Sequence, residues 1–431
     1  MTTPSQHARF RLPRAAAVVA VVAVTAAVAS LLPASPAAAA HAPIGASFFG
    51  VHHAGLHADG ALGWPQTTVG SVRLWDNGVS WRDLETAPGV FDWTRIDAEM
   101  LKAREHGASV LLVLGQTPRF HSTRPGAPGA YGPGATAMPT KAAWVSYVKA
   151  VARRNQTVWN GVADFQVWNE ANVSTYWSGT AAQMATLTAW TRTALRSVGS
   201  GARLISPALV TRLSSQRTWI RAFYGQRVGG RNVSAYVDAL SFQLYPSATG
   251  TPETSMTLLA AVRAILRKDR VSKPIWNTEA NYGLLGGARV ARTIPVARQI
   301  GNVMRTYVLN AQNRVARVYW YSWDLLRLSN TALVGGDRVT LTSAGRAFGT
   351  TRTWLLGTRP AGCTRSKVNT WTCTFTTASQ IRRVVWNPTS SRSLVVPART
   401  TATTWDPTAA PRSAGSRVAL GVVPVLLTTP R

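Results

Sequence analysis

Acidic residues are scarce in this sequence. It has 17 Asp and Glu against 47 Lys and Arg, which gives a formal net charge of +30, and only six of the acids are Glu. Cysteine is rarer still, with two residues, and two thiols supply too few ligands for a metal site. No cluster of His and Asp at ligand spacing adds to them, so we expect neither a metal nor another cofactor.

Long apolar runs are also missing beyond the N-terminus. There, Arg9, Arg11 and Arg14 precede an apolar stretch over residues 15–32 and an alanine run that ends at Ala40. This order is typical of a secretory signal peptide that is cleaved near the end of the alanine run. An uncleaved membrane anchor is the alternative, because the apolar stretch is about long enough to span a bilayer. We predict a secreted, extracellular protein with no stable membrane insertion after cleavage.

A basic helix or a basic–aromatic motif, which would indicate nucleic-acid binding, does not stand out either. The basic residues, all but six of them arginine, are spread along the chain. One interpretation is a composition bias carried by a solvated surface. The other is a basic exterior that holds the protein near an anionic polymer, such as an acidic glycan or the cell envelope. We expect no nucleic-acid partner.

What the sequence does contain is material for a large core, with 46% hydrophobic residues and 17 Trp. From about residue 45 to residue 350, short β-rich runs alternate with longer amphipathic stretches, which is typical of repeated βα units. The β-rich runs lie at residues 47–52, 71–75, 109–114, 164–168, 203–206, 239–244, 274–277 and 317–321. Helical patterns lie between them, for example at residues 95–106, 141–154, 181–198, 255–268 and 295–312.

Eight alternating units of this kind favour an α/β fold, the closed (β/α)₈ or TIM barrel. An open doubly wound sheet is the alternative, but no Gly-rich phosphate loop follows the first strand. A Gly- and Pro-rich segment over residues 117–139 follows the third strand and is too long for an ordinary connection. We expect this segment to be either a functional lid on the active-site face or disordered.

The pattern changes after residue 350. Short alternating runs, at residues 381–386, 393–396 and 417–427, are separated by turn signals, and no helical period is visible. These runs predict a small antiparallel β-sandwich that packs on the barrel. The predicted parts are therefore a signal peptide at 1–40, a catalytic barrel at 41–355 and an accessory β-sandwich domain at 356–431.

The two cysteines, Cys363 and Cys373, both lie in this last part and are ten residues apart. In an exported protein, that spacing suits one disulfide bond that pins a hairpin. Two free, buried thiols are the alternative interpretation.

Two of the six glutamates stand at the ends of apolar, strand-like runs: Glu170 ends residues 164–170, and Glu279 ends residues 274–279. In a TIM barrel the C-terminal ends of the strands meet on one face, so strands four and seven would bring these carboxylates together. One carboxyl group can then protonate the leaving oxygen of a glycosidic bond while the other attacks the anomeric carbon. A separation of roughly 5–5.5 Å between them gives retention, and roughly 6.5–9.5 Å gives inversion.

The other acidic residues have plainer settings. Asp76 and Asp324 follow strands two and eight and are further candidates, although helix capping or pairing with arginine would also explain them. Surface positions are expected for the glutamates in helical or loop patterns, which are Glu85, Glu99, Glu105 and Glu253.

The sequence around both glutamates resembles a known clan of enzymes. Trp168-Asn169-Glu170-Ala171-Asn172 is similar to the acid/base segment of the retaining glycoside hydrolases whose carboxylates end barrel strands four and seven. Trp276-Asn277-Thr278-Glu279 is similar to the nucleophile segment of that clan. Val72-Arg73-Leu74-Trp75 and Phe91-Asp92-Trp93 resemble the opening of members close to families five and thirty-nine. The resemblance covers about residues 45–350, and the trailing β part resembles the accessory sandwich that many members carry.

The resemblance implies a role for each matching position. Glu170 would be the acid/base and Glu279 the nucleophile of a retaining mechanism. Arg73 would favour the ionised form of the nucleophile. Asn169 would hydrogen-bond the sugar 2-hydroxyl, and Tyr245 would hydrogen-bond the nucleophile. Trp323 would lie under the face of the sugar ring. Packing or ion pairing is the alternative for each of these residues.

One position departs from the pattern of the clan. Many members have a histidine two residues before the strand-six tyrosine, whereas this chain has Gln243, which keeps hydrogen-bonding capacity without a titratable group. We expect the change to alter sugar recognition and not the reaction. Further substrate contacts are expected from His52 or His53 at the end of strand one, with a structural role as the alternative. Stacking on sugar rings, or simple packing, is expected of the loop residues Trp177, Phe120 and His121.

These observations predict a secreted, retaining glycoside hydrolase that cleaves O-glycosidic bonds in a β-linked polysaccharide or oligosaccharide of a plant or microbial wall. The sugar, the linkage and the choice between endo and exo action depend on loop shapes and stay open. A non-catalytic carbohydrate-binding barrel of the cell envelope is the alternative. A basic structural protein of the envelope is a third interpretation.

Overall fold

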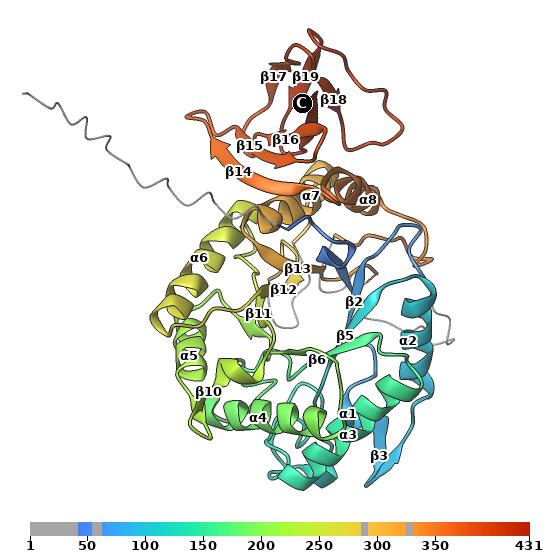
Figure 1. Ribbon diagram of the computed structural model, residues 1–431, viewed down its shortest axis with the longest axis vertical. Helices are drawn as coiled ribbons and strands as arrows, with labels where there is room; N and C mark the ends of the chain where they lie inside the picture. Colours follow the sequence, from blue (N-terminus) through green and yellow to red (C-terminus); the bar gives the residue numbers. More distant parts are fainter. Residues whose placement is uncertain (1–41, 54–62, 286–291, 325–330) are drawn as a thin grey trace, which may run out of the picture. The chain divides into compact units, whose positions relative to one another are not determined.

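The computed structural model describes residues 42–53, 63–285, 292–324 and 331–431 (Figure 1). The predicted signal peptide at residues 1–40 lies outside the described residues. Within the described ranges, no helix has both the length and the apolar character that crossing a membrane requires.

Eight consecutive parallel strand positions form the centre of the fold, and helices surround them (Figure 1). Each lies within a few residues of a run that the sequence predicts, because apolar β-rich residues fill these runs and every residue of six of the strands is buried. The strands are β1 (Phe49–His53), β2 (Ser71–Leu74), β5 (Ser109–Val113), β6 (Ala163–Gln166), β7 (Leu204–Ile205), β11 (Leu240–Gln243), β12 (Ile275–Ala280) and β13 (Val315–Trp320).

The sheet closes on itself. Its order is β7-β6-β5-β2-β1-β13-β12-β11-β8, where β8 (Leu209–Val210) is a short second segment of the fifth strand position. Ile205 in β7 forms a parallel bridge with Ala239, which directly precedes β11. The backbone N–H of Ser206 donates to the Ala239 carbonyl at 3.0 Å. The fold is therefore the predicted (β/α)₈ barrel, and the open doubly wound alternative is excluded.

The barrel helices begin where the sequence supplies caps. Thr140, Thr180, Thr251 and Thr342 each accept a backbone N–H from the first turn of the helix that follows, which satisfies a donor that the helix itself leaves unpaired. Five helices coincide with predicted patterns: α2 (Thr94–Glu105), α3 (Lys141–Thr157), α4 (Ala181–Ser197), α6 (Pro252–Lys268) and α7 (Val296–Gln312). Three more were not singled out from the sequence: α1 (Trp81–Leu84), α5 (Ser214–Tyr224) and α8 (Ser343–Leu355).

Shorter elements decorate the loops. Two hairpins, β3 (Glu85–Ala87) with β4 (Val90–Phe91) and β9 (Arg227–Val228) with β10 (Arg231–Asn232), lie between barrel units. The short 3₁₀ helices are η1 (Ala46–Phe48), η2 (Arg119–His121) and η3 (Val233–Tyr236).

The C-terminal part is a two-sheet β domain, as the sequence predicts. One sheet has the order β14-β15-β16-β20-β18, and the other pairs β17 with β19, all antiparallel. Apolar side chains from both sheets, including Val385, Val418 and Leu427, share one buried cluster. The bounds are β14 (Arg359–Arg365), β15 (Trp371–Thr376), β16 (Gln380–Trp386), β17 (Arg392–Val395), β18 (Thr401–Thr403), β19 (Arg417–Leu420) and β20 (Val425–Pro430).

One predicted run in this domain is divided in the structure. The run over residues 417–427 becomes β19 and β20, which belong to different sheets. Pro424, directly before β20, has no backbone N–H to donate to a ladder, and Gly421 follows the end of β19. Because apolar residues continue to alternate across this turn, the sequence pattern alone predicts one strand where the structure has two.

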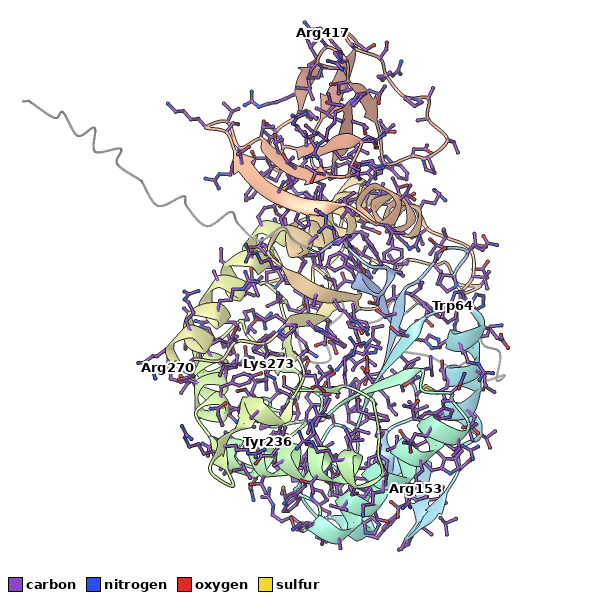
Figure 2. The ribbon with its side chains drawn as sticks, in the orientation of Figure 1. Trp64, Arg153, Tyr236, Arg270, Lys273 and Arg417 are labelled. Carbon is purple, nitrogen blue, oxygen red and sulfur yellow. A yellow bond between two sulfur atoms is a disulfide. The ribbon has the colours of Figure 1, made fainter. Side chains whose placement is uncertain are left out.

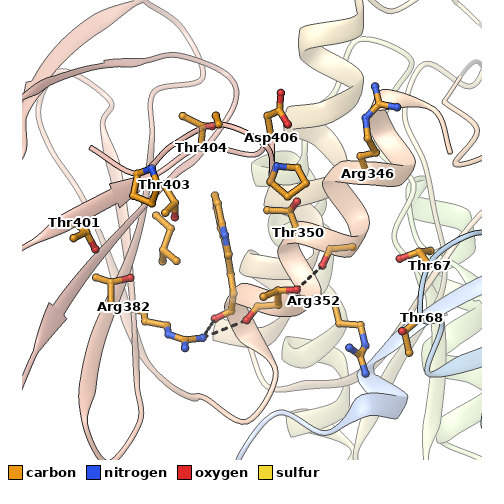
Figure 3. Close-up of a pocket in the computed structure, with 18 of the residues that line it drawn as sticks. Thr67, Thr68, Arg346, Thr350, Arg352, Arg382, Thr401, Thr403, Thr404 and Asp406 are labelled. Carbon is orange, nitrogen blue, oxygen red and sulfur yellow. Dashed lines mark hydrogen bonds between the residues drawn. The ribbon is translucent and has the colours of Figure 1, made fainter. Parts of the chain in front are cut away.

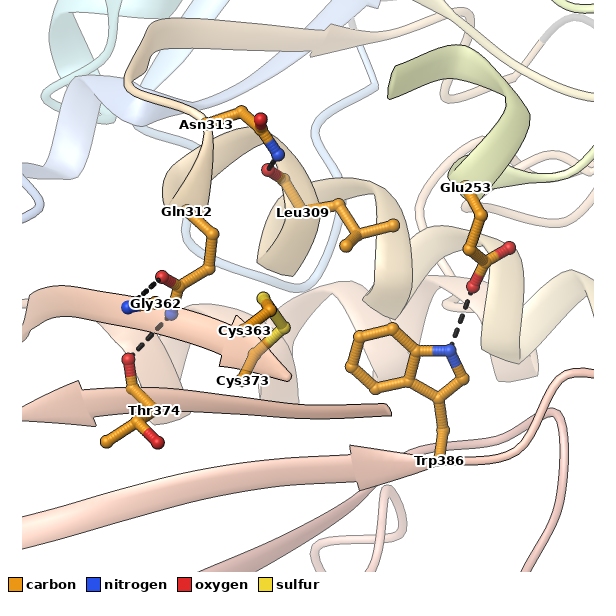
Figure 4. Close-up of a disulfide and its surroundings, with 9 residues drawn as sticks. All are labelled: Glu253, Leu309, Gln312, Asn313, Gly362, Cys363, Cys373, Thr374 and Trp386. Carbon is orange, nitrogen blue, oxygen red and sulfur yellow. Dashed lines mark hydrogen bonds between the residues drawn. A yellow bond between two sulfur atoms is a disulfide. The ribbon is translucent and has the colours of Figure 1, made fainter. Parts of the chain in front are cut away.

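The β domain packs against α7, and the disulfide bond lies in this contact (Figure 4). Cys363 in β14 and Cys373 in β15 face each other in register and are joined, so the predicted hairpin disulfide is confirmed. Gln312 at the end of α7 donates to the Thr374 carbonyl at 2.6 Å and accepts from the Gly362 N–H at 2.8 Å. Helix α7 is consequently buried on nearly all sides, over residues 300–311.

A buried ion pair strengthens the same contact. Both carboxylate oxygens of Glu253 accept from Arg305 Nη1, at 2.9 and 3.0 Å, and Glu253 Oε1 also accepts from Trp386 Nε1 at 2.8 Å (Figure 4). Glu253 therefore ties α6 and α7 to the β domain. The expectation of a surface role for Glu253 is wrong, because Arg305 and the Trp386 indole of the β part hold its carboxylate in this contact.

Basic side chains are distributed over the surface of the chain, as the sequence indicates. The labelled basic residues in Figure 2 are all exposed: Arg153 is in α3, Arg270 and Lys273 are in the loop between α6 and β12, and Arg417 begins β19. The charge is therefore carried by scattered side chains and not by one basic helix.

Candidate active site

Arg73 is the hydrogen-bonding centre of the face where the barrel strands end. It is the third residue of β2 and is completely buried. Its guanidinium donates from Nη1 to Glu279 Oε1 at 2.5 Å, from Nη2 to Asn169 Oδ1 at 2.7 Å and from Nε to Gln166 Oε1 at 2.9 Å. Because Glu279 belongs to β12 while Gln166 and Asn169 end and follow β6, the cation on β2 ties two further strands together at the site.

Glu279 is held from two sides. It is the fifth residue of β12 and is 4% exposed. While Oε1 accepts from Arg73, Oε2 accepts from the phenol of Tyr245 at 2.9 Å. Two donors on an ionised carboxylate favour its charged form and fix the direction in which its remaining lone pairs point.

Glu170 has a contrasting environment. It follows β6 with a backbone φ of 42°, a left-handed conformation that a glutamate seldom adopts, and it is half-buried. Among the described residues, its carboxyl group has neither a hydrogen-bond donor nor an ion-pair partner, although the nearby charge of Arg73 acts to lower its pKa. A strained backbone at a predicted catalytic position is consistent with a functional constraint.

The carboxyl groups of Glu170 and Glu279 interact electrostatically, and their different surroundings give them different pKa values. Desolvation by the surrounding protein, then the charges of Glu279 and Asp76, raise the pKa of Glu170 to about 8. Desolvation also raises the pKa of Glu279, to about 7, but the charge of Arg73 and the bond from Tyr245 oppose that rise. Glu170 is therefore the group that keeps its proton, and Glu279 is the group that loses it first.

Asn169 is positioned by two donors. Its Oδ1 accepts from Arg73 Nη2 and from Gln243 Nε2, the latter at 3.1 Å. This fixes the orientation of the amide and leaves Nδ2 to donate elsewhere. Gln243 is fully buried in β11, so its role here is to orient Asn169.

His52 is structural in this arrangement. Its Nε2–H donates to the Trp75 carbonyl at 2.6 Å, and its Nδ1 lies 3.3 Å from Arg73 Nη1, which must be the donor. Burial and the neighbouring Arg73 charge hold the pKa of His52 well below its usual value, so the ring is neutral. The expected contact with substrate hydroxyls is not available to this side chain, because it is fully buried and both nitrogens are used.

Three tyrosines that the sequence did not indicate also lie at the site: Tyr131, Tyr176 and Tyr321. The phenol of Tyr321, at the end of β13, donates to Asp76 Oδ2 at 3.2 Å and its ring lies 4.6 Å from that of His52. Tyr131 also donates to Asp76, and its ring lies 6.0 Å from that of Tyr176. Alternation along the strands could have indicated Tyr321, whereas Tyr131 lies in a long loop with no periodic signal.

The segment over residues 117–139 lies beside this site. Besides the Tyr131 contact, the Ala130 N–H donates to the Thr175 carbonyl and the Ser178 N–H donates to the Thr136 carbonyl. The segment is stabilised by its own bonds, such as that from Thr117 Oγ1 to the Ala137 carbonyl at 2.7 Å. The segment is therefore ordered, which excludes the disordered alternative, and its function as a lid stays a prediction.

Several aromatic residues are placed differently from what was expected. Trp177 is 2% exposed, packs against Trp168 and donates to the Thr180 carbonyl. Trp323 is 1% exposed and packs between His53 and Trp64. Neither ring presents a face for stacking on a sugar in this structure, because neighbouring aromatic side chains cover both.

The loop residues Phe120 and His121 differ from each other. Phe120 is 46% exposed, whereas the ring of His121 stacks on Trp81 and its Nε2 lies 2.9 Å from Glu85 Oε1. Phe120 therefore remains available for contact with a ligand, and His121 serves packing.

Two more glutamates expected on the surface are buried. Glu85 accepts from the Gly89 N–H at 2.7 Å and from Trp81 Nε1, and Glu99 bonds His53 Nδ1 at 2.9 Å and Asn77 Nδ2 at 3.2 Å. Polar partners from adjacent loops satisfy both carboxylates, which sequence patterns do not reveal. Glu105 is exposed as expected, and Asp324 is half-buried. Across the described ranges, no group of three or more His, Cys, Asp or Glu is arranged to hold a metal ion.

No protein-family model matches the sequence, and no match to a curated protein is found. Solved structures do match. A family 39 glycoside hydrolase from Bacteroides cellulosilyticus WH2 superposes with a TM-score of 0.61 at 17% identity, over 84% of this chain and 75% of that chain.

Two further structures match over nearly their whole length. A GH39 β-xylosidase from Caulobacter crescentus has a TM-score of 0.60 at 14% identity, over 90% of this chain and 97% of that chain. A GH30 endoxylanase from Clostridium papyrosolvens C71 has a TM-score of 0.56 at 13% identity, over 91% of this chain and 98% of that chain. The barrel with its trailing β domain is thus a glycoside hydrolase fold of the GH30 and GH39 type.

Proposed function

We propose that the protein is a retaining glycoside hydrolase in which Glu279 is the nucleophile and Glu170 the acid/base. The observation that carries this proposal is the contrast between the two carboxyl groups. Glu279 is held by Arg73 at 2.5 Å and Tyr245 at 2.9 Å, while Glu170 sits half-buried with a raised pKa. One ionised and one protonated carboxyl group are what double displacement requires.

In the first step, Glu279 attacks the anomeric carbon and forms a glycosyl ester. The glycosidic C–O bond breaks, and Glu170 donates its proton to the departing oxygen. Asn169 supports this step because its Oδ1 is occupied by Arg73 and Gln243, which leaves Nδ2 to donate to the sugar 2-hydroxyl. Bonds to that hydroxyl strengthen in the transition state.

In the second step, the Glu170 carboxylate takes a proton from water, and the water oxygen bonds to the anomeric carbon. The ester bond to Glu279 breaks, so the sugar leaves with its original configuration and Glu170 is protonated again. Arg73 and Tyr245 stabilise the carboxylate that is released, because both remain bonded to it.

The substrate that we propose is a β-linked glycan. Two of the similar structures are described as a β-xylosidase and an endoxylanase, which makes β-xylosides the first substrates to try. Cleavage of the bond would require no cofactor, since both reacting groups are carboxyl groups of the chain.

The test is a screen of aryl β-glycosides and β-linked polysaccharides with proton NMR of the first product. We expect the product to appear first as the β-anomer. Glu105→Gln is the matched control, because Glu105 is an exposed glutamate of α2 and its loss should leave activity unchanged. First release of the α-anomer would overturn the retaining mechanism. Binding of glycans without cleavage of any would favour the carbohydrate-binding alternative.

We also propose that the protein is exported and that residues 1–40 are removed on export. The disulfide between Cys363 and Cys373 supports this, because such bonds persist in oxidising compartments. Mass spectrometry of the protein from the culture medium is the measurement, and we expect a mature N-terminus near His41. A full-length chain retained in the membrane fraction would contradict the proposal.

A further inference from the structure

A pocket of about 700 Å³ lies between helix α8 and the five-stranded sheet of the β domain (Figure 3). We call it the α8 pocket. Its volume is within the range of small-molecule sites, which is roughly 300–1,000 Å³. Eight threonines line it, together with Arg346, Arg352, Arg382 and Asp406. None of the residues of the candidate active site around Arg73, Glu170 and Glu279, which we call the strand-end site, lines it.

The α8 pocket favours a negatively charged ligand. Three guanidinium groups face one carboxylate, that of Asp406. This carboxylate is already engaged, since Asp406 Oδ1 accepts from the N–H and the hydroxyl of Thr408 at 3.0 and 2.8 Å. The charges in the wall therefore leave an excess of positive charge.

The three arginines differ in how far the protein uses their donors. Arg382 Nη1 donates to the Trp354 and Thr353 carbonyls at the end of α8, at 2.8 and 3.3 Å, which is a structural role (Figure 3). Arg346 donates to the Leu341 carbonyl and to Ser343 Oγ, both at 3.2 Å. Arg352 is the one whose donors are left for a ligand.

Two buried polar atoms in the wall have no partner. Arg352 Nε on α8 and Thr403 Oγ1 on β18 are both buried and make no hydrogen bond to any described residue. A buried donor without a partner costs free energy unless water or a ligand satisfies it. That two such atoms from two domains line one pocket indicates a site that a ligand completes.

We propose that the α8 pocket binds an acidic oligosaccharide, with a sugar carboxylate on Arg352 and sugar hydroxyls on the threonines. A guanidinium matches the planar geometry of a carboxylate. Threonine hydroxyls both donate and accept, which suits the hydroxyls of a sugar. The preference for an anion rests on the pocket alone, whereas the choice of a glycan among anions rests on the proposed function.

The test is isothermal titration calorimetry on the full mature chain with three probes: a short oligogalacturonate, a neutral cello-oligosaccharide of equal length, and inorganic phosphate. We expect the oligogalacturonate to bind at least about tenfold more tightly than either of the others. Arg352→Gln should weaken its binding about tenfold or more, because it removes a charge-assisted contact. Thr403→Val, which keeps the shape of the side chain, should weaken it severalfold.

The controls separate this site from the active site and from folding. Arg392→Gln removes the same charge from an exposed position in β17 and should leave binding unchanged. Glu279→Gln should also leave it unchanged, so a failure of the proposed catalytic role does not affect this result. Thermal unfolding of each variant should match that of the unchanged protein.

Three outcomes would overturn the proposal. Unchanged oligogalacturonate binding in both Arg352→Gln and Thr403→Val would remove the pocket as the site. Equal binding of the neutral and acidic oligosaccharides would remove the role of the carboxylate. Binding of inorganic phosphate as tight as that of the oligogalacturonate would reduce the site to an anion site with no glycan preference.

Discussion

The strand-end site and the α8 pocket use arginine in opposite ways. Arg73 is completely buried and all of its bonds are made within the protein, to Glu279, Asn169, Gln166 and His52. Arg352 is half-buried, and its Nε makes no hydrogen bond to any residue in the described ranges. An arginine whose three nitrogens all donate within the protein sets the charge state and the geometry of other residues. One whose donors are left over offers them to a ligand.

The difference predicts that catalysis and binding in the α8 pocket can be removed separately. The largest expected effect is the loss of catalysis. Glu279→Gln should reduce kcat roughly 10⁴-fold or more, because the loss of an attacking group removes the chemical step. Arg352→Gln should leave kcat on a small aryl glycoside unchanged. Steady-state kinetics on both variants are the measurement. A large loss of kcat in Arg352→Gln would contradict the prediction, because it would show that the α8 pocket contributes to catalysis.

Glu170→Gln should have the next largest effect. We expect a loss of roughly 10²- to 10⁴-fold on substrates whose leaving group needs a proton, and a smaller loss on activated aryl glycosides. The pH profile should change as well. Activity of the unchanged protein should rise as Glu279 ionises near its pKa of about 7 and fall as Glu170 loses its proton near about 8.

In the Glu170→Gln variant, the fall on the alkaline side should disappear, because the group that loses its proton is gone. An alkaline limb that persists in this variant would assign the proton donor to another residue.

The sequence predicted those features of the barrel and its site that depend on residues close together in the chain. The eight strands and the positions of Glu170 and Glu279 follow from local patterns, because apolar runs and the residues that end them are adjacent in the chain. Arg73 and Tyr245 were placed by the resemblance of their segments. The structure adds the bonds of these two residues to Glu279, which is 206 and 34 residues away respectively.

Residues whose roles depend on remote neighbours could not be predicted in this way. Trp323 looks like a sugar platform in the sequence but is covered by Trp64 and His53. Glu253 looks like a surface residue until the β domain brings Trp386 onto it. Both errors come from burial by segments distant in the chain, which no local pattern records.

Tyr245→Phe tests how much of the contrast between the two carboxyl groups depends on a neutral donor. Removing the phenol takes one hydrogen bond from the charged form of Glu279, and a bond of this kind contributes enough to change kcat/KM roughly 10- to 100-fold. The acid limb should move to higher pH, because the pKa of Glu279 rises. Tyr236→Phe, in a surface 3₁₀ helix, is the matched control and should behave as the unchanged protein.

Asp76→Asn should have a smaller effect, mainly on the pH profile. The charge of Asp76 raises the pKa of both Glu170 and Glu279, so its removal should shift both limbs toward lower pH, by up to about one unit. Asp92→Asn, at an exposed position, should leave the profile in place. A shift toward higher pH would contradict the electrostatic role assigned to Asp76.

The double variant Cys363→Ser with Cys373→Ser should have the smallest effect on activity. The disulfide closes a short loop in the β domain, so its loss should lower the free energy of unfolding by about 2–3 kcal/mol. Denaturant unfolding measures this change, and kcat at 25 °C should be unaltered. A loss of activity in the folded double variant would show that the β domain acts on the strand-end site.

The most direct test of the central claim is to trap the glycosyl ester. An activated β-glycoside of the best substrate sugar is mixed with the Glu170→Gln variant, and the protein is digested and examined by peptide mass spectrometry. If Glu279 is the nucleophile, one glycosyl group accumulates on the peptide that contains Glu279. A label on any other residue, or turnover to product with the opposite anomeric configuration and no label, would contradict the account.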